Sequence, residues 1–257
     1  MKILAIGDPH GYYKYPKSIF KGVDAILVTG DFGKADIARK RSFENFERKK
    51  KGLPEKEYTL KQNKEEYMEI YNSTMKIVKL LSKRAPTYAI LGNVWPKDDH
   101  AKKDEKKLGI KIPKLVADIK KIKNFYVVKN AIRKINSLKI AFLEYFVDTN
   151  WVQDFKPGDY KKKLKSAKKD TDKARKILKR FGKVDILVCH QPPYGYLDKV
   201  SGKFGAPKSW IGKHAGSKVI LNYIKKHQPK YVFCGHIHEG KGKVKIGKSE
   251  VHNLGYF

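Results

Sequence analysis

Short apolar runs in this chain repeatedly end in a side chain that can bind a metal ion. The runs at residues 3–6 and 25–28 are typical of strands that are buried on both faces. Metal-competent residues follow these two runs and three later ones, and they are Asp8, His10, Asp31, Asn93, His190, His236 and His238. Ligands bind beyond the carboxyl ends of the strands in open α/β sheets. We therefore expect these side chains to meet at one edge of a sheet.

Glycines stand beside these residues at four places, Gly7, Gly30, Gly92 and Gly235. Glycine has no Cβ atom, so it allows the backbone to turn sharply and to approach a ligand closely. The four glycines indicate tight turns around the expected ligand site.

The ligand chemistry predicts two metal ions rather than one. Imidazole, carboxylate and amide groups without a thiolate suit manganese, iron, zinc, cobalt or nickel better than calcium. Seven ligands are too many for one tetrahedral zinc, and they divide naturally into two sites that share a bridging carboxylate. Two metals roughly 3.5–4 Å apart can hold both the attacking and the leaving oxygen of a phosphoryl group. The pattern therefore predicts two divalent metal ions, a phosphate-ester substrate and its hydrolysis.

Each motif alone has a simpler interpretation. A single Asp-x-His or Gly-Asp after a strand is more often a turn or a helix cap, because Asp and Gly are ordinary turn residues. The pair His236 and His238 is harder to explain in that way. Two histidines at this spacing in an extended segment point the same way, and burying both without a metal or another partner is costly.

The order of the motifs resembles that of the calcineurin-like metallophosphoesterase superfamily. The resemblance runs from Asp8 to His238, nearly the whole chain. It implies an α/β fold, a four-layer αββα sandwich with two mixed β-sheets flanked by helices. It also implies that a metal-bound hydroxide attacks phosphorus in line. The implied ligands are Asp8, His10 and His238 for one metal, Asn93, His190 and His236 for the other, and Asp31 as the bridge.

One position departs from the superfamily pattern. The superfamily usually continues Gly-Asn with a histidine that helps the leaving oxygen, whereas this chain has Val94 after Asn93. Losing a general acid typically costs 10²–10⁴ in rate. The favoured function is hydrolysis of a phosphodiester of the nucleotide or nucleic-acid type. The alternatives are a phosphomonoesterase and a weakly active binding or scaffold protein with the same fold.

Asn93 and His214 are the candidate catalytic residues. His214 could replace the missing histidine, because it precedes Ser217, the expected cap of a helix whose N-terminus would suit an anion. The alternative is that His214 only holds its loop in place.

The chain is expected to form a single domain over residues 1–257 with a helical insertion around 34–66. The segment between Asp31 and Asn93 is roughly double what a single crossover helix needs. Its basic and aromatic residues could cover the metal site as a cap and bind single-stranded nucleic acid. The alternative is a helical hairpin with Phe43 and Phe46 packed inward. A second variable region, residues 194–213, follows His190 directly and could select the substrate.

The expected elements follow from the periodicity of apolar residues. The expected strands are 2–7, 24–30, 87–91, 125–128, 138–146, 184–189, 230–234, 243–246 and 249–254. The expected helices are 34–50, 58–84, 97–107, 112–122, 159–181 and 217–227.

The net charge is +32, from 58 lysines and arginines against 26 acidic residues. A nucleic-acid partner would explain this excess, but lysine enrichment is also typical of hyperthermophile proteins. The first metal motif leaves no room for a cleavable signal peptide, and no apolar run approaches the roughly 18–20 residues that span a bilayer. We expect a soluble cytoplasmic protein with no membrane partner. The sequence leaves the oligomeric state open.

Overall fold

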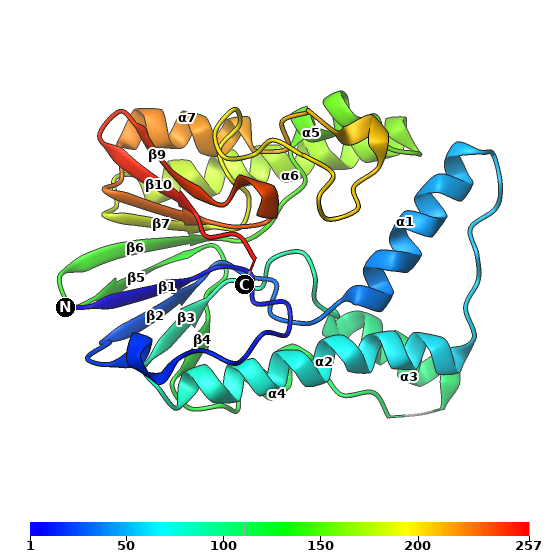
Figure 1. The fold of residues 1–257 in the computed structure, drawn as a ribbon, viewed down its shortest axis with the longest axis horizontal. Helices are drawn as coiled ribbons and strands as arrows, with labels where there is room; N and C mark the ends of the chain where they lie inside the picture. Colours follow the sequence, from blue (N-terminus) through cyan, green and yellow to red (C-terminus); the bar gives the residue numbers. More distant parts are fainter. Residues whose placement is uncertain (110, 257) are drawn as a thin grey trace.

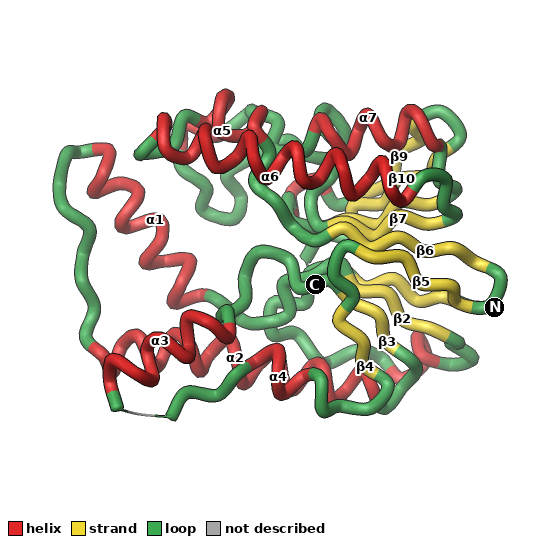
Figure 2. Tube along the Cα trace, turned by 180° about the vertical axis from the view of Figure 1, so that it is seen from behind, coloured by secondary structure: helices red, strands yellow, loops and turns green. Residues whose placement is uncertain are grey.

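Two β-sheets stack face to face, and helices cover their outer faces (Figures 1 and 2). The computed structural model describes residues 1–109 and 111–256. Helices α2, α3 and α4 lie on one side of the paired sheets, and α5, α6 and α7 lie on the other (Figure 1). The predicted two-sheet α/β architecture is confirmed.

The smaller sheet has four strands in the order β1-β2-β3-β4, and every pairing in it is parallel. The prediction of a mixed sheet is therefore wrong for this half of the sandwich. Parallel neighbours need crossover connections, which here include α2 and α4. The strands are β1 (Ile3–Ile6), β2 (Ala25–Val28), β3 (Thr87–Ala89) and β4 (Phe125–Val127).

The larger sheet has six strands in the order β5-β6-β7-β8-β10-β9 and is mixed, as predicted. Its edge strands β5 and β9 pair antiparallel with their neighbours, and the inner pairings are parallel. The strands are β5 (Ala131–Ile135), β6 (Leu138–Leu143), β7 (Ile186–Cys189), β8 (Tyr231–Cys234), β9 (Gly242–Ile246) and β10 (Ser249–Asn253).

Strand β5 was not predicted, because Arg133 and Lys134 interrupt its apolar pattern. It is an edge strand with no fully buried residue, and exposed charges are common at such edges. Asn130 and Asn136 flank it with positive φ angles of 51° and 52°, which turn the chain at both ends.

Alternating side chains of the buried strands divide the core into layers. Ile26 and Val28 pack toward α2, whereas Leu27 lies between them in sequence and packs in the space between the sheets. Val188 faces Leu27 across that space, while Leu187 packs toward α6 and α7. Both sheets are thus buried on two faces, which explains their continuous apolar runs.

The long helices lie where their periodicity predicts. Helix α2 begins at a capping box in which Thr59 and Gln62 satisfy each other's backbone N–H groups, and Thr74, Val78 and Leu81 are buried on its inner face. The helices are α1 (Asp36–Lys50), α2 (Leu60–Ser82), α3 (Asp98–Leu108), α4 (Leu115–Ile119), α5 (Thr149–Phe155), α6 (Tyr160–Phe181) and α7 (Lys218–His227). Short 3-10 helices are Lys17–Phe20, Lys208–Trp210 and His238–Gly240.

Helix α5 is a second missed element. It is only seven residues long, and the Asp148 side chain caps it by accepting from the Asn150 N–H. A segment this short shows too little periodicity for sequence analysis. None of the helices in the described part of the chain is long and apolar enough to cross a membrane.

Helix α1 stands apart from the sheet layers at one end of the molecule (Figure 1), and none of its residues is fully buried. Arg41 pairs with Glu66 of α2 at 2.7 Å, and the Phe46 ring lies 5.3 Å from the Trp210 ring. Helix α1 therefore connects α2 with the loop before α7. Phe46 packs inward as the hairpin alternative expected, whereas Phe43 lines a cavity.

Candidate metal centre

All seven predicted ligands lie at the carboxyl ends of strands or in the loops that follow them. Asp8 follows β1 and Asp31 follows β2 in the smaller sheet, while His190 follows β7 and His236 follows β8 in the larger one. The two sheets therefore deliver ligands to the same edge of the sandwich. Asn93 and His10 reach this edge from the adjoining loops, and His238 reaches it from the start of a short 3-10 helix.

The first group consists of Asp8, His10 and His238, whose potential ligand atoms all lie within 4.8 Å of one another. Asp8 is fully buried. The Thr29 hydroxyl donates to its Oδ1 atom at 2.9 Å, and the backbone N–H of His236 donates to Oδ2. These two donors fix the orientation of the carboxylate.

The second group consists of Asp31, His190 and His236, again with ligand atoms within 4.8 Å of one another. Asp31 Oδ2 lies 3.3 Å from His190 Nε2 and 3.8 Å from His10 Nε2, so this carboxylate stands between the two groups. Asn93 joins the second group, because its Oδ1 atom is 2.7 Å from His190 Nε2.

The backbone around the centre leaves no room for larger residues at the predicted glycines. A Cβ atom at Gly92 would lie 2.3 Å from Asp31 Oδ1, and one at Gly235 would lie 2.3 Å from Asp8 Oδ1. His10, Asp31 and His236 have φ angles of 43°, 46° and 67°. Left-handed conformations at such residues cost energy and cluster at functional sites, so the surrounding fold must hold these turns.

Two imidazole nitrogens in the centre are buried and have no hydrogen-bond partner within the described part of the chain: His10 Nε2 and His238 Nε2. Leaving such atoms without a partner is costly. A divalent metal ion would satisfy them, and the mixed set of imidazole, carboxylate and amide donors suits such an ion. The residues therefore fit the metals that the sequence predicted.

The electrostatics of the histidines differ across the centre. Burial lowers the pKa of His236 to about 3 and also lowers the pKa of His10, so both are neutral and able to bind a metal at neutral pH. Burial also disfavours a charged His190, but the Asp31 and Asp8 carboxylates outweigh it and raise the pKa of His190 to about 9. The same contact with His190 holds the pKa of Asp31 well below its usual range despite burial.

A cavity of about 870 Å³ opens above the centre. Asp31, Asn93, His236 and His238 belong to its floor. Its walls come from α1, the first half of α2, the loop after Asn93, the loop before α7 and the C-terminal segment. These walls include Arg39, Phe43, Val94, Phe204, Trp210 and Tyr256.

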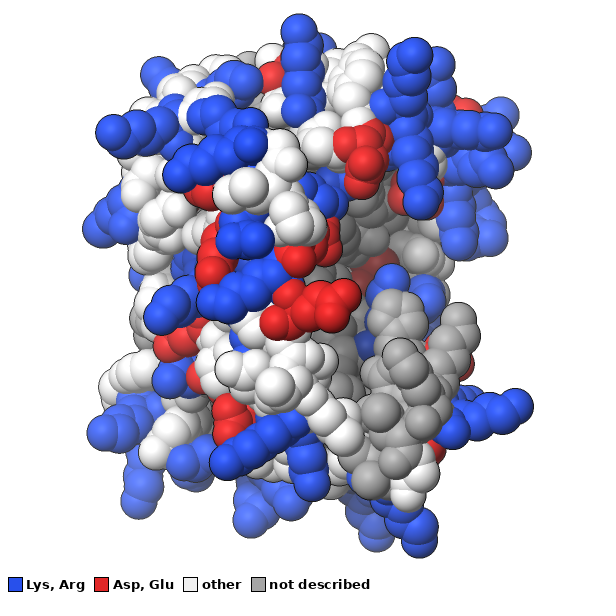
Figure 3. Space-filling model, turned by 90° about the vertical axis from the view of Figure 1, so that its right-hand side faces the viewer, with Lys and Arg blue, Asp and Glu red and all other residues white. Residues whose placement is uncertain are grey.

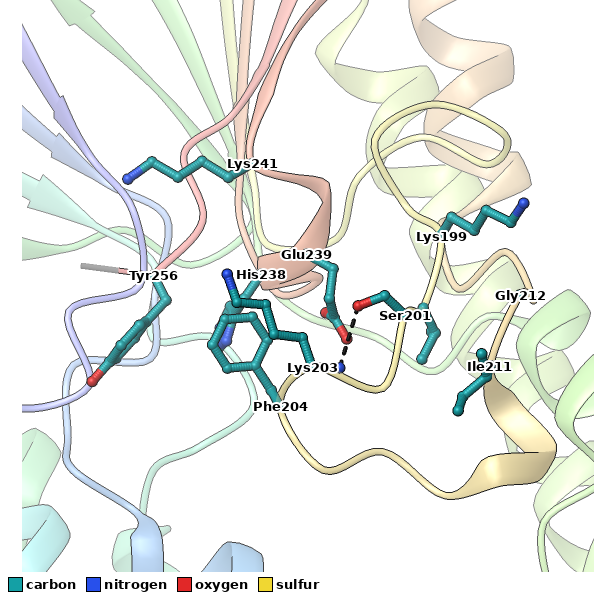
Figure 4. A pocket seen from close by; sticks show the side chains of 11 residues that line it. Lys199, Ser201, Lys203, Phe204, Ile211, Gly212, His238, Glu239, Lys241 and Tyr256 are labelled. Carbon is teal, nitrogen blue, oxygen red and sulfur yellow. Dashed lines mark hydrogen bonds between the residues drawn. The ribbon is translucent and has the colours of Figure 1, made fainter.

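A second cavity of about 830 Å³ lies on the other side of His238. Figure 4 shows Lys199, Lys203 and Lys241 around it, with Phe204 and Tyr256 beside His238. His238, Phe204 and Tyr256 line both cavities. The Phe204 ring lies edge-on to His238 at 5.3 Å, so these aromatic side chains form a shared wall.

His214 lines neither of these two cavities. Its Nδ1 atom lies 2.6 Å from Asp198 Oδ1, and the other oxygen of Asp198 accepts the N–H groups of Gly195 and Gly216. His214 is thus part of a hydrogen-bonded loop before α7, and its catalytic role stays a prediction.

Two residues that hold the ligands, Thr29 and Tyr145, were not predicted. The Thr29 carbonyl lies 2.9 Å from His190 Nδ1, which orients the imidazole. The Tyr145 ring packs on both His190 and His236, with centroids 5.7 and 5.4 Å apart. Strand β6 was expected to continue to residue 146, but it ends at Leu143. If the strand had been predicted to end at Leu143, Tyr145 would also have been recognised as a residue that follows a strand.

The chain is similar to curated proteins and to solved structures. Metallophosphoesterase domain-containing protein 1 of Homo sapiens and of Mus musculus are each 37% identical to the chain over 71 residues, or 27% of this chain. The match covers only 19% of the length of these relatives. A solved crystal structure shares the fold with a TM-score of 0.59 at 16% identity, over 99% of this chain and 90% of its own. The family model for calcineurin-like phosphoesterases matches residues 1–240, and the chain therefore belongs to that family.

Proposed function

We propose that this protein hydrolyses phosphate esters with the help of two divalent metal ions. The observation that carries the proposal is the cluster of seven metal-competent side chains beneath an open cavity. Two buried imidazole nitrogens in it have no hydrogen-bond partner among the described residues. Membership of the phosphoesterase family supports the same reaction class.

Asp8, His10 and His238 would hold one metal, and Asn93, His190 and His236 the other, with Asp31 shared between them. When bound, a metal pair would supply an activated water molecule and would neutralise charge on the phosphoryl oxygens. Manganese, iron, zinc, nickel and cobalt all suit these donors.

The protein's own groups orient this machinery. Thr29 holds Asp8 through its hydroxyl and His190 through its carbonyl. The backbone N–H groups of Asn93 and Val94 both donate to Asp31 Oδ1 at 2.8 Å, which leaves Oδ2 directed toward the histidines. Metal-ligand side chains that are held in this way need little rearrangement when the substrate binds.

A phosphodiester suits the site better than a monoester, because His238 has a cavity on each side. A diester has two substituents on phosphorus, and each cavity could accept one of them. The lysines of the second cavity favour an anionic substituent, as in a nucleotide or nucleic acid. Helix α1 would serve as the cap over the first cavity, within a single domain spanning the chain.

The test is turnover of bis-p-nitrophenyl phosphate and p-nitrophenyl phosphate by metal-stripped protein reloaded with manganese, nickel or cobalt. We expect activity that requires metal and a higher kcat/KM for the diester. No turnover of either compound by protein that binds two metals per chain would contradict an enzymatic role and favour a binding or scaffold role. A higher kcat/KM for the monoester would contradict only the diester preference.

A further inference from the structure

The residue after Asn93 contributes no charge to the cavity, because it is Val94. Its backbone N–H is directed to Asp31 Oδ1. A phosphate ester at the centre would develop additional negative charge during hydrolysis, and a positive group on the open side of the cavity would stabilise it. His214 lines neither cavity, so a positive group that does line the first cavity is the better candidate.

Arg39 of helix α1 lines the same cavity as Asp31, Asn93 and Val94. Its guanidinium carbon lies 5.7 Å from the centre of the Phe43 ring and 5.9 Å from that of Phe204. Among the described residues, no carboxylate forms an ion pair with Arg39. Arg39 is exposed, and these cation–π contacts with two rings place its guanidinium at the cavity with its N–H donors available for an anion.

Contacts along α1 hold Arg39 over the cavity. Before it, the Ile37 N–H donates to Glu69 of α2. After it, Arg41 pairs with Glu66, and Phe46 packs against Trp210. Because Phe204 also packs on His238, the chain of contacts runs from the arginine through one aromatic ring to the metal centre.

We propose that Arg39 binds a phosphate oxygen of the substrate and supplies the positive charge that Val94 cannot. The inference rests on the proposed hydrolysis of phosphate esters. In this role Arg39 neutralises charge on the phosphate and transfers no proton. Its planar fork of donors matches two phosphate oxygens.

The first test compares Arg39→Met and Arg39→Lys with Lys40→Met. Lys40 is exposed on the same helix and lines neither cavity, so its variant controls for the loss of one charge. We expect Arg39→Met to lower kcat/KM about 10²–10³-fold, Arg39→Lys to lower it less, and Lys40→Met to change it less than about twofold. Added guanidinium should partly restore Arg39→Met. Equal losses in the Met variants, or Arg39→Met activity within about threefold of wild type, would overturn the proposal.

The second test measures binding of inorganic phosphate to the metal-loaded protein by calorimetry, which needs no turnover. We expect Arg39→Met to weaken phosphate binding at least tenfold with two metals still bound, and Lys40→Met to leave it unchanged. Unchanged phosphate affinity in Arg39→Met would overturn the role of Arg39. If the wild-type protein bound phosphate through Arg39 but hydrolysed no ester, the proposed function would fail and the anion site would stand.

Discussion

At the scale of single residues, Asp31 should matter most, because it stands between the two ligand groups. Its Oδ2 atom approaches both His190 and His10. We expect Asp31→Ala to abolish binding of both metals, as measured by elemental analysis of the purified protein. Asp172→Ala, which removes an exposed carboxylate of α6, is the matched control and should keep two metals. Retention of both metals by Asp31→Ala would show that this residue is not the bridge.

Gly92 is the second decisive residue, because its φ angle is +80° and a Cβ atom would contact Asp31 Oδ1. Gly22 also has a positive φ, +68°, but nothing lies within 4 Å of its Cβ position. We expect Gly22→Ala to cost about 1 kcal/mol of unfolding free energy through backbone strain alone. Gly92→Ala should cost about 1–3 kcal/mol more and should weaken metal binding. Urea denaturation of the metal-free variants measures these unfolding free energies. Equal losses in Gly22→Ala and Gly92→Ala would contradict the steric argument.

His190 should make metal binding depend on pH. Its pKa is raised to about 9 in the metal-free protein by Asp31 and Asp8, despite burial, yet a metal requires the neutral imidazole. The affinity of the second ligand group for its metal should therefore rise with pH up to about 9, by at most about tenfold per pH unit. His236, with a pKa lowered to about 3, is already neutral and releases no proton at pH 7.

Calorimetry in buffers of different ionisation enthalpy measures this proton release. We expect about one proton to be released from His190 when the second site fills at pH 7. His252→Gln, in strand β10 outside both ligand groups, should release the same number. Binding without proton release would mean that His190 is neutral before the metal arrives.

At the scale of elements, α1 depends on few contacts, because it has no fully buried residue. The ring pair Phe46 and Trp210 should be its main attachment to the second half of the chain. We expect Phe46→Ala to speed amide exchange in α1 about tenfold, since aromatic pairs contribute about 0.5–1.5 kcal/mol. Strands β2 and β7 should keep their protection.

Tyr160→Ala is the matched control for the α1 experiment, because it removes an exposed aromatic ring from α6. It should leave exchange in α1 unchanged. If Phe46→Ala accelerated exchange equally in α1 and in both sheets, α1 would be an integral part of the core rather than a separately attached element.

At the scale of the whole molecule, the charge of +32 remains the main argument for a nucleic-acid partner. Figure 3 shows lysines and arginines spread over the face that includes the α1 end, with acidic side chains among them. We expect single-stranded RNA to bind at low salt and to lose affinity steeply between 50 and 200 mM salt, as counterion release requires. A fluorescence titration measures this. Absence of binding at low salt would exclude the partner and leave the charge as a solvated surface.

Much of the fold could be predicted because the buried strands are recognisable from their local sequence. Residues 25–28 and 186–189 are continuous apolar runs, and both form strands buried on two faces. Strand β5 was missed because it is an edge strand with Arg133 and Lys134 exposed to solvent. The parallel pairing of the whole smaller sheet was also missed, since pairing direction depends on crossovers and not on the strands themselves.

By itself, the sequence determined which residues could bind metals and in what order the strands deliver them. This was possible because a ligand such as Asp31 or His190 lies within three residues of the end of the strand that places it, so its position is a local property. Only the tertiary structure decided what faces the metal centre. Arg39 meets Phe204, and Phe46 meets Trp210, across long stretches of chain. Such contacts depend on how α1 and the loop before α7 pack together, and neither segment carries a local signal of the other.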